Sequence, residues 1–403
     1  MNVKESPVAE VCTLVTRGIS PAYDEQGIPV LSQKCIRDNR VIYEAARLTN
    51  PDKKKIPADK FIQIYDVLVN STGVGTLGRV AQVKRLDREV TVDSHVSIVR
   101  PDSVKIDPRY FGYAMVLNQP KIEAMGEGAT GQTELSRTRL GIEVHIPRLS
   151  LPVQRRIAGI LSAYDELIDN SQRRIRILEK MARSLYREWF VQFRFPGHEK
   201  VKMEGGIPTG WGKIALPDCV QLNPRVVVTR DGEKPFVPMG CLSNDSMLIS
   251  DVESRSGNSG AKFQNGDTLF ARITPCLENG KTGFVQFLSG ASAVAFGSTE
   301  FIVMRSRTLT PEFVYCLARS DEFRGTAIKS MSGASGRQRV QEHCFDEFII
   351  AHPPRALLDR FSAIVSPSFR MIQKLHLQIQ NLRQTRDLLL PRLLSGQVNL
   401  KEN

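Results

Sequence analysis

Two long stretches of the chain carry apolar side chains at alternating steps of four and three residues. Spacing of this kind, sustained over four heptads, is typical of helices that pair through one apolar seam. Each seam position in the first stretch has a counterpart 204 residues later, which indicates an internal repeat. The seam positions are Ile157, Leu161, Tyr164, Ile168, Ser171, Ile175, Leu178, Ala182 and Leu185, then Phe361, Val365, Ser368, Ile372, Leu375, Ile379, Leu382, Arg386 and Leu389.

The length of the two stretches favours spacer helices. A helix of more than about 30 residues is roughly 50 Å long, which exceeds the width of a small domain. Two ordinary amphipathic helices, each packed on its own domain, remain the alternative. Pro152 and Pro354 stand near the expected starts of the helices, and Pro391 closes the second. Pro367 lies inside the second pattern and predicts a kink or a later start there.

Shorter patterns repeat ahead of each long helix. "DVLVNSTGVGTLGRVAQV" from Asp66 corresponds to "DTLFARITPCLENGKTGFVQF" from Asp267, and both predict a strand, a polar loop and a second strand. A later strand ends in Arg100 or Arg305, and a helix is expected to begin at the proline that follows. Finally, "GATGQTELSR" at 128–137 matches "GASGRQRVQE" at 333–342. The chain therefore contains the same supersecondary unit twice.

These patterns predict an α+β fold in which two similar mixed α/β domains alternate with two long helices. Because the two seams match, the helices are expected to pair antiparallel, with pseudo-two-fold symmetry and one domain at each end. The predicted segments are a first domain at 1–150, a spacer helix at 151–190, a connector at 191–210, a second domain at 211–352, a second spacer helix at 353–391 and a tail at 392–403.

The stretch "PCLENGKTG" at 275–283 raises two other interpretations. Gly280-Lys281-Thr282 matches the end of a phosphate-binding loop, but Pro275 takes the place of its first glycine and has no backbone N–H to offer a phosphate. Pro275-Cys276 also resembles the nucleophile motif of cytosine methyltransferases. The sister copy has neither the Lys-Thr pair nor a cysteine, so we expect an ordinary loop of the repeated unit.

The excess of basic residues favours a polyanionic partner. Net charge is +12 over 403 residues, which suits nucleic acid first and a membrane surface second. Seven scattered cysteines without C-x-x-C spacing predict free thiols in a reducing compartment, and the histidines show no metal-ligand spacing. No apolar run is long enough to span a membrane and no signal peptide is seen, so a cytoplasmic protein is expected.

Several longer motifs point to one family. They are "NSTGVGTLGRVA", "RITPCLENGKTGFV", "LPVQRRIAGILSAYDELIDNSQRRIRILEKMARSLYREWFVQFRFP" with the following "GIPTGW", and the terminal "LLLPRLLSGQV". With them, nearly the whole chain resembles the specificity (S) subunit of type I restriction-modification systems. The resemblance implies a non-catalytic DNA reader, in which each of two target recognition domains reads one half of a split, asymmetric site.

The resemblance also implies partners and cofactors. Such subunits dock two adenine-methylating subunits on their central helices, and restriction/translocase subunits join through these. No cofactor is expected on this chain, and S-adenosylmethionine, ATP and Mg are expected on the partners.

The chain has no [DN]-P-P-[FYW] motif and no Gly-rich cofactor loop, which an adenine methyltransferase needs. If a spacer of roughly 50 Å sets the gap, the half-sites lie about one and a half turns of B-DNA apart.

Contacts to DNA are expected from polar and basic residues of the repeated loops, since loops commonly carry recognition groups. Arginine suits guanine and glutamine suits adenine in the major groove. The alternative for each basic residue is a solvated surface charge. The candidates are Ser71, Thr72, Arg79, Thr130, Gln132 and Arg137 in the first domain and Arg272, Lys281, Ser335, Arg337, Gln338 and Arg339 in the second.

Two interpretations from other classes stay open at this point. A self-sufficient DNA methyltransferase would need the cofactor loop and the Pro-Pro motif that are missing. A free-standing DNA-binding or scaffold protein, which uses its helices only to hold two domains apart, is compatible with the sequence. The stretch "WFVQFRF" at 189–195 alternates as a strand would, and we expect its aromatic side chains to pack in a core.

Overall fold

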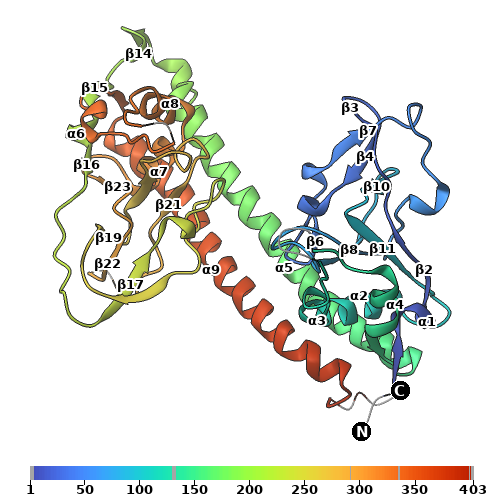
Figure 1. Cartoon of the computed structure of the whole chain (residues 1–403). Coiled ribbons are helices and arrows are strands. Elements are labelled where there is room, and N and C mark those ends of the chain that lie inside the picture. Colours follow the sequence, from blue (N-terminus) through green and yellow to red (C-terminus); the bar gives the residue numbers. More distant parts are fainter. Residues whose placement is uncertain (1–3, 129–132, 291, 335, 399, 401–403) are drawn as a thin grey trace. The chain divides into compact units, whose positions relative to one another are not determined.

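The computed structural model describes residues 4–128, 133–290, 292–334, 336–398 and 400. Contacts within the chain define two compact units (Figure 1). The first unit consists of residues 1–167 and 382–403, and the second of residues 168–381. The two long helices therefore contribute to both units. The domain boundaries proposed from the sequence stay a prediction.

The first unit is built on two four-stranded sheets. One has the order β2-β11-β8-β9 and is antiparallel throughout, and the other has the order β10-β4-β7-β3 with β10 and β4 parallel. Its elements are β1 (Glu5–Pro7), α1 (Val8–Val11), β2 (Cys12–Arg17), β3 (Tyr23–Asp24), β4 (Ile28–Leu31), β5 (Ile36–Arg37), β6 (Arg40–Val41), β7 (Arg47–Thr49), β8 (Val67–Asn70), β9 (Val80–Gln82), β10 (Thr91–Val92), β11 (Val96–Pro101), α2 (Pro108–Leu117), α3 (Gln119–Glu123), α4 (Arg137–Glu143) and β12 (His145–Pro147).

The second unit repeats this design. Its antiparallel sheet has the order β16-β23-β20-β21, and its second sheet has the order β18-β17-β22-β19 with β17 and β22 parallel. Its elements are β13 (Met203–Glu204), β14 (Ile207–Pro208), β15 (Gly212–Ala215), α6 (Leu216–Cys219), β16 (Val220–Leu222), β17 (Glu233–Val237), β18 (Glu253–Ser256), β19 (Ala261–Gln264), β20 (Thr268–Ala271), β21 (Thr282–Phe284), β22 (Val294–Gly297), β23 (Phe301–Ser306), α7 (Pro311–Ala318), α8 (Asp321–Lys329) and β24 (Ile349–His352).

The internal repeat and the predicted fold class are confirmed by this topology. Strands β2, β8, β9 and β11 of the first unit take the same places as β16, β20, β21 and β23 of the second. The outer pairs β1-β12 and β15-β24 also correspond. The helices expected after the prolines begin at Pro108 and Pro311, where Asp107 and Thr310 cap the free N–H groups of the first turn.

An ion pair between an arginine and a buried aspartate stabilises the antiparallel sheet of each unit, and we call this pair the clamp. Arg100 binds Asp66 through two hydrogen bonds of 2.8 and 2.7 Å, and Arg305 binds Asp267 through two of 2.7 and 2.6 Å. Both carboxylates are 1% exposed. Each also accepts a bond from the backbone N–H three residues before it. The paired, planar geometry fixes the register between the two strands that carry the residues.

Alternate residues of the sheet in the first unit face two different cores. Val67 and Val69 pack with helix α2 and with both long helices, while Leu68 points to a second core shared with Val92 and Ile98. This two-sided burial follows from the period of two along a strand. It explains why the strand "VLVN" reads as an uninterrupted apolar run.

The long helices are α5 (Leu151–Tyr186, 36 residues) and α9 (Arg355–Leu394, 40 residues). In the first unit, Ile157 and Leu161 of α5 share a core with Leu390 and Leu393 of α9. The beginning of one helix thus meets the end of the other, as antiparallel pairing requires. Asp165 reinforces this contact, because its carboxylate accepts bonds from Arg386 (2.7 Å), Lys84 (2.6 Å) and Tyr113 (2.8 Å).

The charge of Asp165 is held by these three donors. Burial by itself raises the pKa of the Asp165 carboxyl, but Lys84, Arg386 and Tyr113 outweigh it, so the pKa lies below the ordinary range. Burial, together with the contact to Asp165, raises the pKa of Tyr113. Asp165 therefore stays ionised at neutral pH and ties both long helices to the first unit.

In the second unit, aromatic side chains join the end of α5 to the beginning of α9. A π-helical turn, Arg187–Val191, follows α5 and places Phe190 4.8 Å from Phe313 and 5.0 Å from Phe361 between ring centres. Trp189 and Phe195 are also buried. The core-packing interpretation of "WFVQFRF" is confirmed, whereas its strand-like alternation was misleading because the stretch begins with a helical turn.

All eighteen predicted seam positions are buried or half-buried. Of the two outcomes expected at Pro367, the later start is wrong, since α9 begins at Arg355 and continues through this proline. The kink stays a prediction. Pro367 is exposed, so the carbonyl freed by its missing N–H can bond to water. Among the described residues, none of the helices combines the length and apolar character that a membrane crossing requires.

Candidate nucleic-acid interface

Two loops that match between the repeats lie together in the first unit. Residues 71–79 connect β8 to β9, and the carbonyl of Ser71 accepts a bond of 2.8 Å from the backbone of Leu135. Thr72 forms an isolated bridge with Glu134. The side chain of Asn70 donates to the carbonyls of Gln33 and Thr76, which holds the base of the loop.

The second unit brings the corresponding loops together in the same way. Residues 272–281 connect β20 to β21, and the carbonyl of Arg272 accepts a bond of 2.8 Å from the backbone of Val340. Ile273 forms a bridge with Arg339, as Thr72 does with Glu134. Each unit thus presents a paired loop surface, which we define by its described residues: 71–79 with 127–128 and 133–134 in the first unit, and 272–281 with 332–334 and 336–339 in the second.

The candidates in the first unit occupy different environments. Ser71 is fully buried, and its hydroxyl lies 2.6 Å from that of Ser97. Thr72 bonds to the ring of His95 at 2.8 Å, and Arg79 donates to the carbonyl of Gly75 at 2.8 Å. Arg137 is exposed at the first residue of α4. Thr130 and Gln132 lie outside the described residues.

Two candidates in the second unit are held by carboxylates. Arg339 binds Glu300 through its Nε (3.0 Å) and Nη2 (2.8 Å), and Arg272 lies 3.4 Å from Glu342 and 4.0 Å from Glu300. These ion pairs orient both guanidinium groups before any ligand arrives. The roles of these residues in DNA contact stay a prediction.

The remaining candidates of the second unit are Lys281, Gln338, Arg337 and Ser335. Lys281 donates to the carbonyl of Met239 at 3.0 Å. The backbone of Gln338 pairs with Thr274, while Arg337 is exposed near the tip of its loop. Ser335 lies outside the described residues. Arg137 and Arg337 are thus the most accessible of the described arginine candidates.

Sequence reasoning missed two buried groups that anchor the 272–281 loop. Arg319 donates through Nη1 to the carbonyls of Gly280 (2.5 Å) and Asn244 (2.9 Å). The Nη2 atom of Arg319 lies 3.8 Å from the carboxylate of Glu179 in α5. This carboxylate also accepts hydrogen bonds from the hydroxyls of Tyr315 and Ser246, the latter at 3.0 Å. A glutamate directly beside the seam position Leu178 was the one signal that could have suggested this network.

The cysteines are free thiols, as the sequence predicted. Burial raises the pKa of Cys12 to about 12 and raises that of Cys316 as well, so both stay protonated and unreactive at neutral pH. Among the residues that the structure describes, no three His, Cys, Asp or Glu side chains gather as metal ligands would.

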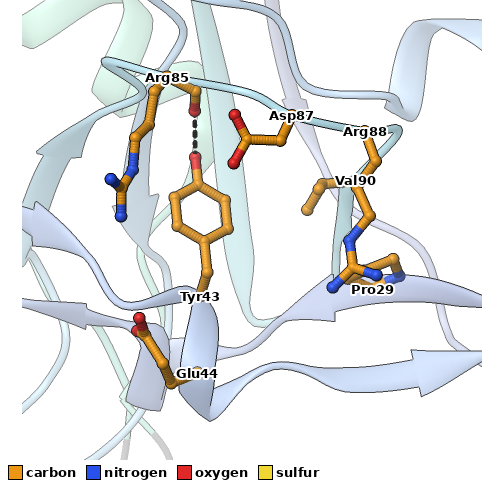
Figure 2. A pocket seen from close by; sticks show the side chains of 7 residues that line it. All are labelled: Pro29, Tyr43, Glu44, Arg85, Asp87, Arg88 and Val90. Carbon is orange, nitrogen blue, oxygen red and sulfur yellow. Dashed lines mark hydrogen bonds between the residues drawn. The ribbon is translucent and has the colours of Figure 1, made fainter.

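The described residues of each unit line a cavity. The one in the first unit measures about 180 Å³, and Figure 2 shows Tyr43 and Glu44 on one side of it and Arg85, Asp87 and Arg88 on the other. The Tyr43 hydroxyl donates to the Arg85 carbonyl at 2.7 Å. Acidic and basic side chains alternate around this cavity, so it has no clear preference for an anion.

The cavity in the second unit is larger, about 540 Å³, and its charged lining is entirely basic. Among the described residues it is lined by Asn223, Pro224, Arg225, Val226, Val227, Gly260, Ala261, Lys262, Arg272, Thr299, Phe301 and Val303. We call it the basic groove. It adjoins the paired loop surface through Arg272.

The fold and these surfaces define a class of protein with two diverged copies of one α/β unit, two shared long helices and a pair of loops presented by each copy. Comparison with known proteins shows what the chain is similar to. Residues 2–180 match the type I restriction modification DNA specificity domain, and the predicted resemblance to type I specificity subunits is confirmed.

Two curated relatives carry the same description. The chain is 26% identical over 278 residues to the type I restriction enzyme MjaIX specificity subunit of Methanocaldococcus jannaschii, a match that covers 64% of this chain and 62% of the relative. It is 32% identical over 155 residues to the EcoEI specificity subunit of Escherichia coli, covering 37% and 26%. The chain thus spans less than two thirds of the length of these relatives.

A solved structure shares the fold along the whole chain. The S subunit of a type I restriction-modification system from M. genitalium superposes with a TM-score of 0.61 at 15% identity, covering 100% of this chain and 97% of that one. At this identity the likeness concerns the fold alone.

Proposed function

We propose that this chain is the DNA sequence-specificity subunit of a type I restriction-modification complex and is not itself a catalyst. Each unit would read one half of a bipartite, asymmetric DNA site. The observation that carries the proposal is the paired loop surface, which is built on the same strands in both units but carries different side chains. Two units with corresponding strands but different loop side chains suit two half-sites of different sequence.

The chemistry of the loops fits this role. Both surfaces present arginine, threonine and backbone groups, which are common donors to phosphates and base edges. The net charge of +12 supplies the sequence-independent attraction that DNA binding requires. A self-sufficient methyltransferase is the weaker alternative, because the sequence has neither of the two motifs that such an enzyme needs.

Methylation of chromosomal adenines tests the proposal. In cells that express an adenine-methylating subunit able to pair with this chain, we expect a gapped, asymmetric motif to become methylated only when this chain is present. Exchanging residues 1–150 for those of another specificity subunit should change one half of that motif and leave the other intact. Methylation that does not depend on the chain, or a continuous motif, would favour a free-standing DNA-binding protein instead.

We further propose that the adenine-methylating subunits dock on the long helices and bring restriction subunits with them. S-adenosylmethionine, ATP and Mg would then be bound by these partners, and none by this chain. Support comes from two apolar side chains one turn apart on α5, Ile177 (50% exposed) and Met181 (61% exposed). Exposed apolar pairs on a helix suit burial against a partner.

Charge introduced at this position should separate docking from DNA binding. We expect Ile177→Asp combined with Met181→Asp to weaken capture of the methylating subunit at least about tenfold, because each carboxylate would lose its water in the interface. Binding of duplex DNA by the full chain should be unchanged. The matched control is Val104→Asp at an 81% exposed position of the first unit. Equal capture by all three proteins would place the docking surface elsewhere.

A further inference from the structure

The basic groove of the second unit has a wall made by a stretch without regular structure. This connector, residues 223–232, joins β16 to β17 and is seen as the long yellow-green trace between them in Figure 1. It carries Arg225, which is exposed, and Val227, which is 90% exposed. Both side chains line the groove, so it offers a cation and an apolar group that are open to solvent.

Three cations surround an apolar floor in this groove. Arg225 comes from the connector, Lys262 from β19 and Arg272 from the loop after β20, while Phe301 and Val303 of β23 form part of the lining. None of the described lining residues is acidic. Glu342 and Glu300 contact Arg272 from outside the lining and hold its guanidinium in place.

The charged groups of the described groove lining are cations, and its one amide is already paired. Asn223 is the one amide in the described lining, and both ends of it are occupied: its Nδ2 donates to Glu342 and its Oδ1 accepts from the backbone of Val303 at 2.9 Å. Base recognition needs unpaired donors and acceptors at fixed positions, whereas phosphate recognition needs mainly positive charge.

The groove is continuous with the paired loop surface. The backbone of Arg272 binds Val340 at the end of the 332–339 loop, while the Arg272 side chain lines the groove. Glu342, two residues beyond Val340, bonds to Asn223 at the start of the connector. A duplex that places its bases against the loop therefore has a neighbouring length of backbone within reach of the groove.

We propose that the basic groove binds the sugar–phosphate backbone of duplex DNA beside the half-site of the second unit. Arg225 and Lys262 contact phosphates, and Val227 contacts deoxyribose. This inference rests on the proposed DNA-reading function. It assigns affinity and register on the DNA to the groove, and sequence preference to the loop at 332–339.

The salt dependence of DNA binding tests the assignment. Duplex DNA of random sequence is titrated with the full chain at several salt concentrations between about 50 and 200 mM, and the logarithm of the binding constant is plotted against that of the salt concentration. For Arg225→Gln and for Lys262→Gln, we expect the slope to become less negative by about 0.9, the value for one lost phosphate contact. The double variant should lose about twice as much.

The matched control is Arg307→Gln, which removes an exposed cation of the same unit. Arg307 follows the far end of β23 and donates to the carbonyl of Pro217, away from the groove lining. Its slope should equal that of the unchanged chain. Slopes of the groove variants that match this control would overturn the inference while leaving the proposed function intact. An unchanged chain that does not bind duplex DNA at all would overturn both.

A second readout distinguishes backbone contact from base reading. In the methylation experiment, Arg225→Gln with Lys262→Gln should lower the fraction of methylated sites and leave the motif unaltered. Arg337→Ala, at an exposed position of the loop, should instead relax the second half of the motif. A motif altered by the groove variants would contradict the assignment of the groove to phosphates.

Discussion

Replacing Asp267 with alanine should lower the free energy of unfolding of the second unit by about 3 kcal/mol, the lower end of the range for breaking a buried ion pair. The carboxylate is 1% exposed and holds Arg305 through two hydrogen bonds, so its loss leaves a guanidinium without a partner. The side chain of Arg305 is 22% exposed and can recover part of its hydration, which sets the effect at the lower end.

Hydrogen exchange followed peptide by peptide checks this result, because it reports on each unit separately. Asp267→Ala should speed exchange in β20 and β23, and Asp66→Ala should do the same in β8 and β11 of the first unit. Glu253→Ala is the control: it removes the partner of Arg255 in an ion pair that is about half exposed, which contributes at most about 1 kcal/mol. Equal effects of Asp267→Ala and Glu253→Ala would show that the clamp is dispensable.

The second large effect is expected at Phe190. Truncation to alanine should destabilise the second unit by about 3–5 kcal/mol, since it removes a buried ring and leaves a cavity. Phe190 is 5% exposed and contacts both Phe313 of α7 and Phe361 of α9. The loss should therefore loosen the beginning of α9 as well as the contact with α7 in the second unit.

Chemical denaturation and hydrogen exchange in α9 measure this effect. Val191→Ala provides the control, because it lies in the same π-helical turn and is 47% exposed. Its effect should remain within about 0.5 kcal/mol, as for most surface substitutions. If Phe190→Ala unfolds at the same denaturant concentration as the control, the aromatic cluster does not hold the two helices together.

Sequence reasoning best predicted two kinds of element: helices with a hydrophobic pattern sustained over many turns, and strands whose sequence occurs in both repeats. Helices α5 and α9 were predicted from the seam, and the strands around Asp66 and Asp267 from the match between repeats. The clamp was missed although Asp66 and Arg100 had both been singled out. A sequence places residues on strands but does not give the register that brings two strands into contact.

The candidate site shows the same limit. Matching loops were identified in the sequence, yet their pairing within each unit became visible only in the structure. Ser71 directly follows β8 and is buried, with its hydroxyl against that of Ser97 in β11, a contact that loop composition does not reveal. The basic groove was missed since Arg225, Lys262 and Arg272 come from three separate segments, and only Arg272 lies in a repeated motif.

The clamp also bears on how such a chain can change over generations. Because the protein contains two copies of one unit, it provides its own alignment of two sequences. Asp66 and Asp267 agree, as do Arg100 and Arg305, whereas the tips of the paired loops differ. After a duplication, each loop can drift without disturbing the frame beneath it. The two units of one chain can thus acquire new ligand preferences independently. The number of possible combinations is then the number of variants of the first unit multiplied by the number of variants of the second.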